Sequence, residues 1–252
     1  MFMGMRLFSR ASSTSFHLIR SARVALLLAC APHAADAQAT VPGSSGVEPT
    51  RIRFGTMEYS LTIVRGDEEE AIGVLRDELM PIRSNDPVLR RVMVLARSGE
   101  LLIDSTLTDL ETLAPRWHNS VQPKRTIDFE MFGKRVKGTL ADKGSPARTI
   151  DTTLADLAFD SSNWDLVVRS LPLENGDAAV LSVYDVDRHL QKYTVRVIDR
   201  TVKGKTDIIH VTVETGRGSE IHAWFDDNTR VLLRVETKLG PDTLLRQVLK
   251  PM

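Results

Sequence analysis

Hydrophobic and polar residues alternate along most of the chain after residue 51. In segments 57–63 and 127–131, every second side chain is apolar. Turn residues such as Gly133-Lys134 interrupt these runs roughly every eight to twelve positions. Because successive side chains of a β-strand point to opposite faces, a period of two puts the apolar ones on one face. The pattern therefore predicts an all-β fold of antiparallel strands.

Segment 161–171 is the one stretch of comparable length with the period of a helix. Its apolar side chains share one helical stripe: Trp164, Val167, Val168 and Leu171. Ser162 followed by Asp165 resembles a capping box, and Pro172 ends the segment. A lone amphipathic helix among strands needs an apolar partner, so we expect it to lie across one face of the sheet. The simplest interpretation of Trp164 is a core residue.

The loops near the C-terminus suggest a register for four strands. We expect three-residue loops at 216–218 and 227–229 and a two-residue turn at 203–204. The expected facing pairs are Ile198 with Ile209, Ile209 with Phe225, and Phe225 with Val231. One face of this unit is then almost wholly apolar, and it is the predicted core.

The opposite face of the same unit carries a graded stripe. Its rows are Val197, His210, Trp224 and Leu232; then Val195, Thr212, His222 and Arg234; then Tyr193, Glu214, Glu220 and Glu236. A sheet face in contact with water is normally polar throughout. Two interpretations remain open: the helix at 161–171 covers the apolar end of the stripe, or the stripe lines a cavity for an apolar ligand.

The N-terminal residues 1–39 have the order of a secretion signal. A basic stretch ending at Arg23 leads into the apolar run 24–31, and small-residue cleavage patterns follow at 35–37 and 37–39. An amphipathic organelle presequence is the alternative. The apolar run is far shorter than the ~20 residues that a membrane-crossing helix needs, so no transmembrane span is expected.

The only cysteine, Cys30, lies inside this segment. The residues before it resemble the lipobox of bacterial lipoproteins, which keeps a lipid-anchored form as an alternative. Cleavage after Ala37 or Ala39 instead leaves a chain without disulfides, thiol nucleophiles or thiolate metal sites. Residues 40–50 are predicted to be a flexible linker with nothing to bury, and 51–252 a single antiparallel β domain.

Charge and motifs exclude several classes of function. The chain holds 33 basic and 33 acidic residues, and removing the four arginines and one aspartate of 1–39 leaves 29 and 32. A mildly acidic surface does not attract phosphate backbones, so nucleic acid is not an expected partner. Serine-hydrolase, P-loop and dinucleotide-binding motifs are absent from the sequence. We therefore expect no enzyme, no catalytic residues and no cofactor.

Histidines give only a weak metal signal. The four that follow the signal segment, His118, His189, His210 and His222, have no close metal-ligand spacing. In the expected register His210 and His222 lie diagonally on one face of adjacent strands. They could form half of a metal site, but a packing pair beside Trp224 is the simpler interpretation, so no metal is expected.

Several short motifs resemble a known family. They are Phe159-Asp160, Trp164, Arg169-Ser170-Leu171-Pro172-Leu173, Tyr184, Trp224-Phe225-Asp226 and Leu232-Leu233-Arg234. Over roughly residues 52 to 240 the chain resembles exported bacterial β-rich proteins grouped as domain-of-unknown-function family three-one-zero-eight. Those proteins are similar to the periplasmic lipoprotein-carrier fold. The resemblance implies a curled antiparallel sheet or unclosed half-barrel with a helix packed on one face, and a groove for acyl chains; it brings no catalytic residues.

Two functional hypotheses follow for an exported, periplasmic envelope protein. The first is a binding module that holds an apolar or amphipathic, lipid-like ligand between sheet and helix. Its expected ligand-binding residues are Trp164, Val197, His210, His222, Trp224, Leu232 and Arg234, with Arg234 able to bind a head group. The second is a structural or interaction module of the envelope with a filled core and no ligand. Protein partners are not predicted.

Overall fold

Strands make up most of the computed structural model, which describes residues 39–97, 99–174, 178–216 and 219–251. The strands are β1 (Gly55–Arg65), β2 (Glu68–Ile82), β3 (Val88–Arg97), β4 (Glu100–Asp109), β5 (Pro115–Gln122), β6 (Arg125–Phe132), β7 (Arg135–Asp142), β8 (Arg148–Thr153), β9 (Phe159–Asp160), β10 (Ala178–Asp185), β11 (His189–Lys203), β12 (Thr206–Thr215), β13 (Ser219–Asp226), β14 (Leu232–Gly240) and β15 (Thr243–Leu249). The helical segments are η1 (Pro49–Arg51), η2 (Ser161–Asn163) and α1 (Trp164–Ser170). The all-β prediction is confirmed.

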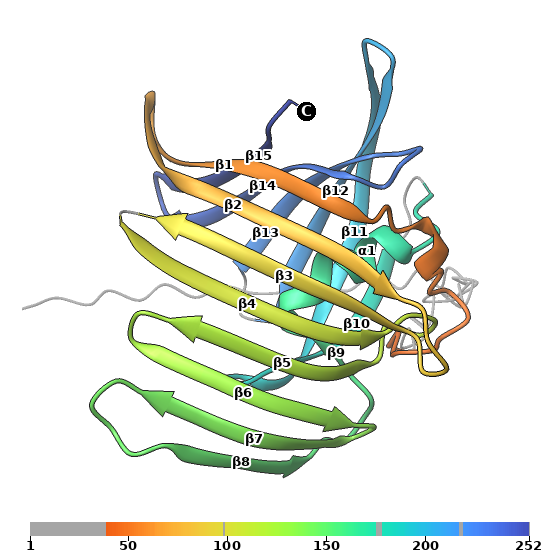
Figure 1. Ribbon diagram of the computed structural model, residues 1–252. Helices are drawn as coiled ribbons and strands as arrows, with labels where there is room; N and C mark the ends of the chain where they lie inside the picture. Colours follow the sequence, from red (N-terminus) through yellow and green to blue (C-terminus); the bar gives the residue numbers. More distant parts are fainter. Residues whose placement is uncertain (1–38, 98, 175–177, 217–218, 252) are drawn as a thin grey trace, which may run out of the picture. The chain divides into compact units, whose positions relative to one another are not determined.

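All these strands belong to one sheet (Figure 1). Its order is β8-β7-β6-β5-β4-β3-β2-β1-β15-β14-β13-β12-β11-β10-β9. Most neighbours are consecutive in the chain, and β1 pairs with β15 to join the two runs. Pairing is antiparallel except between β9 and β10. Because β8 and β9 are the two edges, the sheet is an unclosed half-barrel, as the family resemblance implies.

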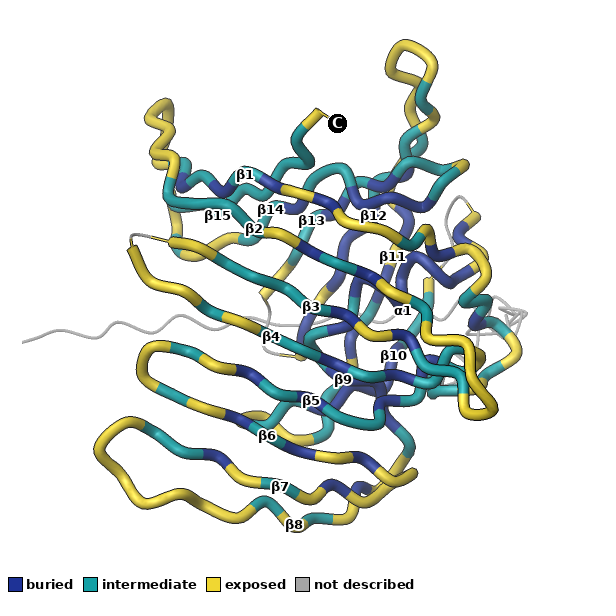
Figure 2. Tube along the Cα trace, viewed as in Figure 1, coloured by how far each residue is buried: buried dark blue, intermediate teal, exposed yellow. Residues whose placement is uncertain are grey.

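The expected alternation is visible along the strands (Figure 2). In β1 the buried residues are Met57, Tyr59, Leu61 and Ile63, and in β6 they are Ile127, Phe129 and Met131. Burial of each such side chain contributes about 1.5–3 kcal/mol. These faces form the inner side of the sheet, against which the single α-helix of the described residues packs.

The helix lies on the inner face. Val167, Val168 and Leu171 are buried, and they share one hydrophobic core with Ile209 and Phe225. The predicted apolar stripe of the helix therefore packs into the core. The observed cap differs from the prediction. Asp160, and not Ser162, caps η2 by accepting the Ser162 backbone N–H at 2.9 Å. Asp165 instead enters a buried ion cluster.

That ion cluster joins the helix to β2 and β3. Arg91 donates to Asp77 at 2.8 and 2.9 Å and to Asp165 at 2.7 and 3.2 Å. Arg169, which has no exposed surface, donates to Asp165 at 2.8 Å. Two guanidinium groups and two carboxylates are thus buried together with balanced charge. Such a cluster fixes the position of the helix, because either charge alone would be very costly to bury.

The short edge strand β9 is covered on both sides. Leu181 and Val183 of β10 point into the core that contains the helix, whereas Tyr184 belongs to a second core with β6 and β7. Tyr184 meets Phe129 edge-on, with ring centroids 5.5 Å apart. Nearby, Asp160 lies 2.8 Å from Nδ1 of His118 on β5. This burial protects an edge that could otherwise pair with another chain.

The register of the C-terminal strands is partly as predicted. β12 and β13 pair as expected, with Ile209 opposite Phe225. The predicted turn at 203–204 between β11 and β12 is wrong. Lys203 pairs with Thr206, and the register shifts by one residue at Ile198. A one-residue shift moves a side chain to the other face, so Val197 points into the core.

The β13–β14 pairing also differs from the prediction. Phe225 lies opposite Leu232 instead of Val231, and the register shifts by one at Leu233. Leu232 is consequently buried on the inner face. The same shift puts Arg234 opposite Trp224, whereas the expected row placed Leu232 there.

The segment before β1 contacts the domain. Thr40 forms a parallel bridge to Leu181 in β10, and Val47 is 9% exposed within the core. The expectation that residues 40–50 have nothing to bury is therefore wrong, while the boundary at 51 stays a prediction. Apart from Ala39, the predicted signal at 1–39, with Cys30, lies outside the described residues.

Candidate functional site: a groove on the outward face

A row of polar and aromatic side chains crosses the outward face of β12–β15. His210 pairs with Trp224, Trp224 with Arg234, and Arg234 with Val248, each on the neighbouring strand. The row exists because these residues alternate with buried ones, such as Phe225 beside Trp224. Cross-strand neighbours of this kind lie close enough for side chains to interact directly.

Trp224 is the centre of this row. The His210 ring stacks on the indole with centroids 4.4 Å apart and an interplanar angle of 9°. The Arg234 guanidinium carbon lies 4.6 Å from the indole centroid, in the range of a cation–π contact. The indole is therefore fixed in orientation before any ligand arrives.

The two predicted histidines are linked. His210 Nε2 lies 3.0 Å from His222 Nδ1, and His222 Nε2 lies 2.8 Å from Glu220. On the other side, His210 Nδ1 is 3.4 Å from Asp199. The chain of groups orients both imidazoles, because each ring nitrogen has a polar partner. These four linked groups are carboxylates and imidazoles, and none of them is a hydroxyl or thiol nucleophile.

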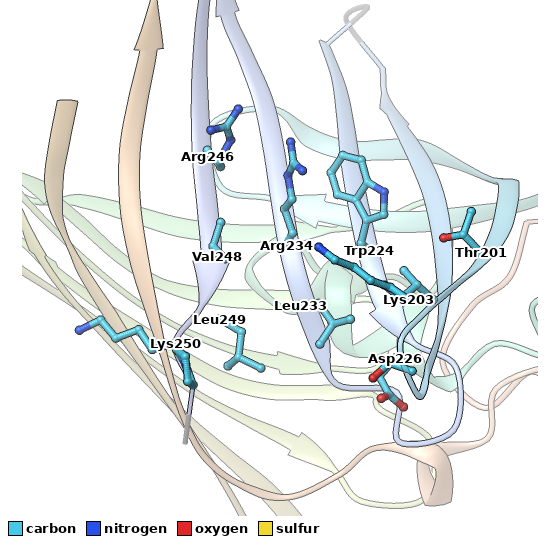
Figure 3. A pocket seen from close by; sticks show the side chains of 13 residues that line it. Thr201, Lys203, Trp224, Asp226, Leu233, Arg234, Arg246, Val248, Leu249 and Lys250 are labelled. Atoms are coloured by element: carbon cyan, nitrogen blue, oxygen red, sulfur yellow. The ribbon is translucent and has the colours of Figure 1, made fainter. Parts of the chain in front are cut away.

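A groove of about 840 Å³ opens next to Trp224 (Figure 3). Its lining residues are Thr201, Lys203, Thr206, Ile208, Trp224, Asp226, Leu233, Arg234, Arg246, Val248, Leu249, Lys250 and Pro251. The side chains come from β11 to β15 and the residues directly after β15. Apolar side chains form much of the lining, and four cations face a single acid, Asp226. The groove therefore combines an apolar surface with positive charge.

Two of the four cations share one carboxylate. Glu236 accepts hydrogen bonds from Arg234 and, at 2.8 Å, from Arg246, which also pairs with Glu69. Burial alone would raise the pKa of Glu236, but the hydrogen bonds from the two arginines outweigh burial and lower it. Glu236 therefore stays ionised and holds both guanidinium groups at the groove.

A second groove of about 780 Å³ continues along the same strands. It is lined by Ser219, Glu220, His222, Glu236, Lys238, Leu239, Gly240, Pro241, Asp242, Thr243 and Leu244. Most of its lining residues are polar, and acids outnumber bases. Of the two grooves, the first is the better match for a ligand with an apolar part.

The described residues hold no cluster of three or more metal-ligating side chains. Across the same residues, helices long and apolar enough to span a membrane are likewise absent. Neither the geometry of the groove nor the comparisons below indicate catalysis.

A protein-family model described as "Protein of unknown function (DUF3108)" matches residues 59–246. The chain belongs to this family. The family resemblance expected from the short motifs is confirmed. No curated protein matches the chain.

Solved structures show that the fold occurs elsewhere. The chain is similar to a β-barrel-like protein of domain of unknown function DUF1849 from Brucella abortus, with 14% identity, a TM-score of 0.52, and coverage of 81% of this chain and 97% of that one. It also matches a candidate lipoprotein from Parabacteroides distasonis, with 12% identity, a TM-score of 0.26, and coverage of 78% and 94%. A candidate exported protein with a YmcC-like fold from Bacteroides fragilis matches with 11% identity, a TM-score of 0.25, and coverage of 83% and 98%. The first match shows a shared fold, and the scores of the other two are too low to carry an argument.

In this DUF3108 protein the seven predicted ligand-binding residues separate into two groups. His210, His222, Trp224 and Arg234 come together on the outward face. Trp164, Val197 and Leu232 lie on the inner face, in or against the core. The register shifts at Ile198 and Leu233 put Val197 and Leu232 on the inner face, and hairpin loop lengths cannot reveal such shifts.

Sequence reasoning missed much of the groove. The sequence predicts a turn at Lys203, whereas the structure places it at the end of β11. Arg246 and Val248 lie on β15, a strand that the expected four-stranded unit does not include. A signal for β15 was present. Leu244, Arg246 and Val248 alternate with Leu245 and Gln247 over a strand-like stretch.

Proposed function

We propose that this DUF3108 protein is an exported envelope protein that binds an amphipathic, lipid-like ligand in the groove beside Trp224. The observation that carries the proposal is the groove itself. Its volume of about 840 Å³ falls within the ~300–1,000 Å³ of small-molecule sites. It joins an apolar lining to four cations, the combination that an amphipathic anion requires.

The ligand site is proposed on the outward face and not between sheet and helix. Val167, Val168 and Ile209 are at most 1% exposed at the helix–sheet interface. The buried cluster of Arg91, Asp77 and Asp165 occupies the same interface. A ligand there would have to displace close-packed core, whereas the outward groove is open to solvent.

Export rests on the N-terminal sequence. The basic stretch, the apolar run 24–31 and the small-residue patterns that follow have the order of a secretion signal. Cleavage after Ala37 or Ala39 gives a periplasmic form, and lipidation of Cys30 gives an anchored one. The mass of the mature chain distinguishes these forms.

The test is native mass spectrometry of protein purified gently from its own envelope fraction, followed by organic extraction. We expect a co-purifying apolar or amphipathic molecule that is lost in Trp224→Glu. Trp117→Glu is the matched control, because Trp117 is a half-buried tryptophan on the outward face of β5, away from the groove. Thermal melts of both variants exclude unfolding as the cause. A bare mature chain, or equal loss of ligand in both variants, contradicts the proposal.

A structural or interaction module of the envelope is the second candidate. The interface between α1 and the inner face favours it, because the residues packed there are buried in one hydrophobic core. This candidate predicts no co-purifying molecule, so the wild type and Trp224→Glu should each have the mass of their own bare chain. The experiment above therefore separates the two candidates.

A further inference from the structure

The four cations of the groove differ in how well their charge is matched. Arg234 and Arg246 share Glu236, and Arg246 also pairs with Glu69. Lys250 lies 3.8 Å from Glu58, with 40% of its side chain exposed. Lys203 has no acidic partner among the described residues. Lys203 is therefore the cation of the lining whose charge no neighbouring acid matches at ion-pair distance among the described residues.

The single acid of the lining, Asp226, is hydrogen-bonded within its own loop. Asp226 accepts the Thr229 backbone N–H at 2.7 Å, so its carboxylate already stabilises the β13–β14 loop. Asp226 has no ion pair with Lys203 or Arg234 among the contacts of the described residues. An anion from outside the protein would supply the missing partner.

The β11–β12 hairpin positions Lys203 for this role. Lys203 is the last residue of β11 and pairs with Thr206, so Gly204 and Lys205 form the turn. Figure 3 shows the Lys203 side chain extending across the groove towards Arg234. Two cations from strands far apart in sequence thus converge beside the apolar side chains Trp224 and Leu233.

Arg234 adds a second observation. Its Nε atom is buried and has no hydrogen-bond partner among the described residues, although the guanidinium is held by Glu236 and stacked on Trp224. A guanidinium that is already oriented in this way can donate to an anion in the groove with little further ordering. Both cations beside the apolar lining therefore favour an anionic ligand group.

We infer that the groove selects an amphiphile with an anionic head group, a carboxylate or a phosphate, bound between Lys203 and Arg234. The apolar chain of the ligand lies along Ile208, Trp224 and Val248. This inference rests on the proposed function and specifies its ligand. Lys203 is the residue that determines the preference for charge, because it is the cation whose charge is not already matched.

Fluorescence titration of the natural chain with dansyl-labelled undecanoic acid and with its methyl ester tests the inference. The two probes share one chain and differ in head-group charge. We expect the acid to bind about tenfold more tightly than the ester, since a charge-assisted hydrogen bond contributes ~1.5 kcal/mol or more. Added salt should weaken binding of the acid and leave binding of the ester unchanged.

Lys203→Gln should remove most of the difference between acid and ester. Lys205→Gln is the matched control: it changes the same charge two residues away, on the turn, outside the groove lining. Dodecyl phosphate as a competitor distinguishes the two head groups, because tighter binding than the acid assigns a phosphate and weaker binding assigns a carboxylate.

Each outcome decides one level of the proposal. Equal affinity for acid and ester, or equal effects of Lys203→Gln and Lys205→Gln, overturns the head-group inference while the groove remains a binding site. Failure of acid, ester and alkyl phosphate alike to bind contradicts the proposed function itself.

Discussion

Neighbouring residues of strands β12–β14 lie on opposite faces of the sheet and have very different surroundings. On the inner face, Ile209, Val211 and Phe225 have no exposed surface. One residue away on the outward face, His210 and Trp224 stack beside an open groove. The strands and their backbone hydrogen bonds are shared. If the groove binds the proposed ligand, stability and binding are assigned to alternate residues of one strand.

Charged side chains are also arranged differently on the two faces of the sheet. Inside, Arg91 and Arg169 are matched by Asp77 and Asp165 and are shielded from water. Outside, four cations surround a groove with one acid in its lining. Inner charges should therefore control folding and outer charges binding. The following changes test this division.

Asp165→Asn should have the largest effect on stability. It removes the carboxylate that both Arg91 and Arg169 use, leaving two buried cations with one acid. We expect the free energy of unfolding to fall by about 3–5 kcal/mol in urea titrations. Asp151→Asn is the control, because its pair with Arg135 is about half exposed and should contribute less than ~0.5 kcal/mol. A similar small loss for both variants would show that the inner cluster is not structural.

Phe225→Ala and Trp224→Ala compare the two faces at adjacent residues of β13. Phe225 is completely buried, so its truncation should cost about 3–4 kcal/mol. Trp224 has one side open to the groove, so its truncation should cost about 1–2 kcal/mol and abolish binding of the lipid-like ligand. Chemical denaturation and ligand titration of both variants measure these effects. The opposite order of stabilities would place the core on the outward face.

His118 gives stability a dependence on pH. Burial alone would lower the pKa of His118, but Asp160 and Asp104 outweigh it and raise the pKa from 6.5 to about 10. A raised pKa in the folded state means that the ion pair contributes fully below pH 6.5 and is lost as the pH rises towards about 10. We expect the free energy of unfolding to fall by up to about 1.4 kcal/mol per pH unit across this range. His118→Gln should flatten the profile, and an NMR titration of His118 with an ordinary pKa would contradict the assignment.

Lys203→Gln should have the smallest effect on stability. Its side chain is exposed and has no acidic partner among the described residues, so the free energy of unfolding should change by less than ~0.5 kcal/mol. Binding of anionic amphiphiles should nevertheless weaken. Parallel thermal melts and titrations measure the two effects, and a large loss of stability would assign Lys203 to the fold.

Much of the fold could be predicted because it follows local rules. Alternation at 57–63 and 127–131 predicts strands, the stripe from Trp164 to Leu171 predicts the helix, and the loop at 216–218 predicts the β12–β13 register. Each of these depends on residues that are close in sequence or on burial of one face.

The candidate site was harder to predict because it depends on register shifts in the strand pairing. Register shifts at Ile198 and Leu233 decide which of Val197, Leu232 and Arg234 face the groove. Such shifts arise from how the whole curled sheet packs, and no residue pattern near them signals their position. Arg91, the buried partner of Asp165 from outside the helix, lies on β3, which a local helix-cap motif cannot indicate.

The most direct test follows the indole N–H signals of the three tryptophans in a two-dimensional NMR spectrum as the dansyl-labelled acid is added. If the ligand binds in the outward groove, the Trp224 signal shifts, and those of Trp117 and Trp164 stay in place. A shift of the Trp164 signal, with Trp224 unchanged, would put the ligand between sheet and helix and contradict the division of the sheet into a core face and a binding face.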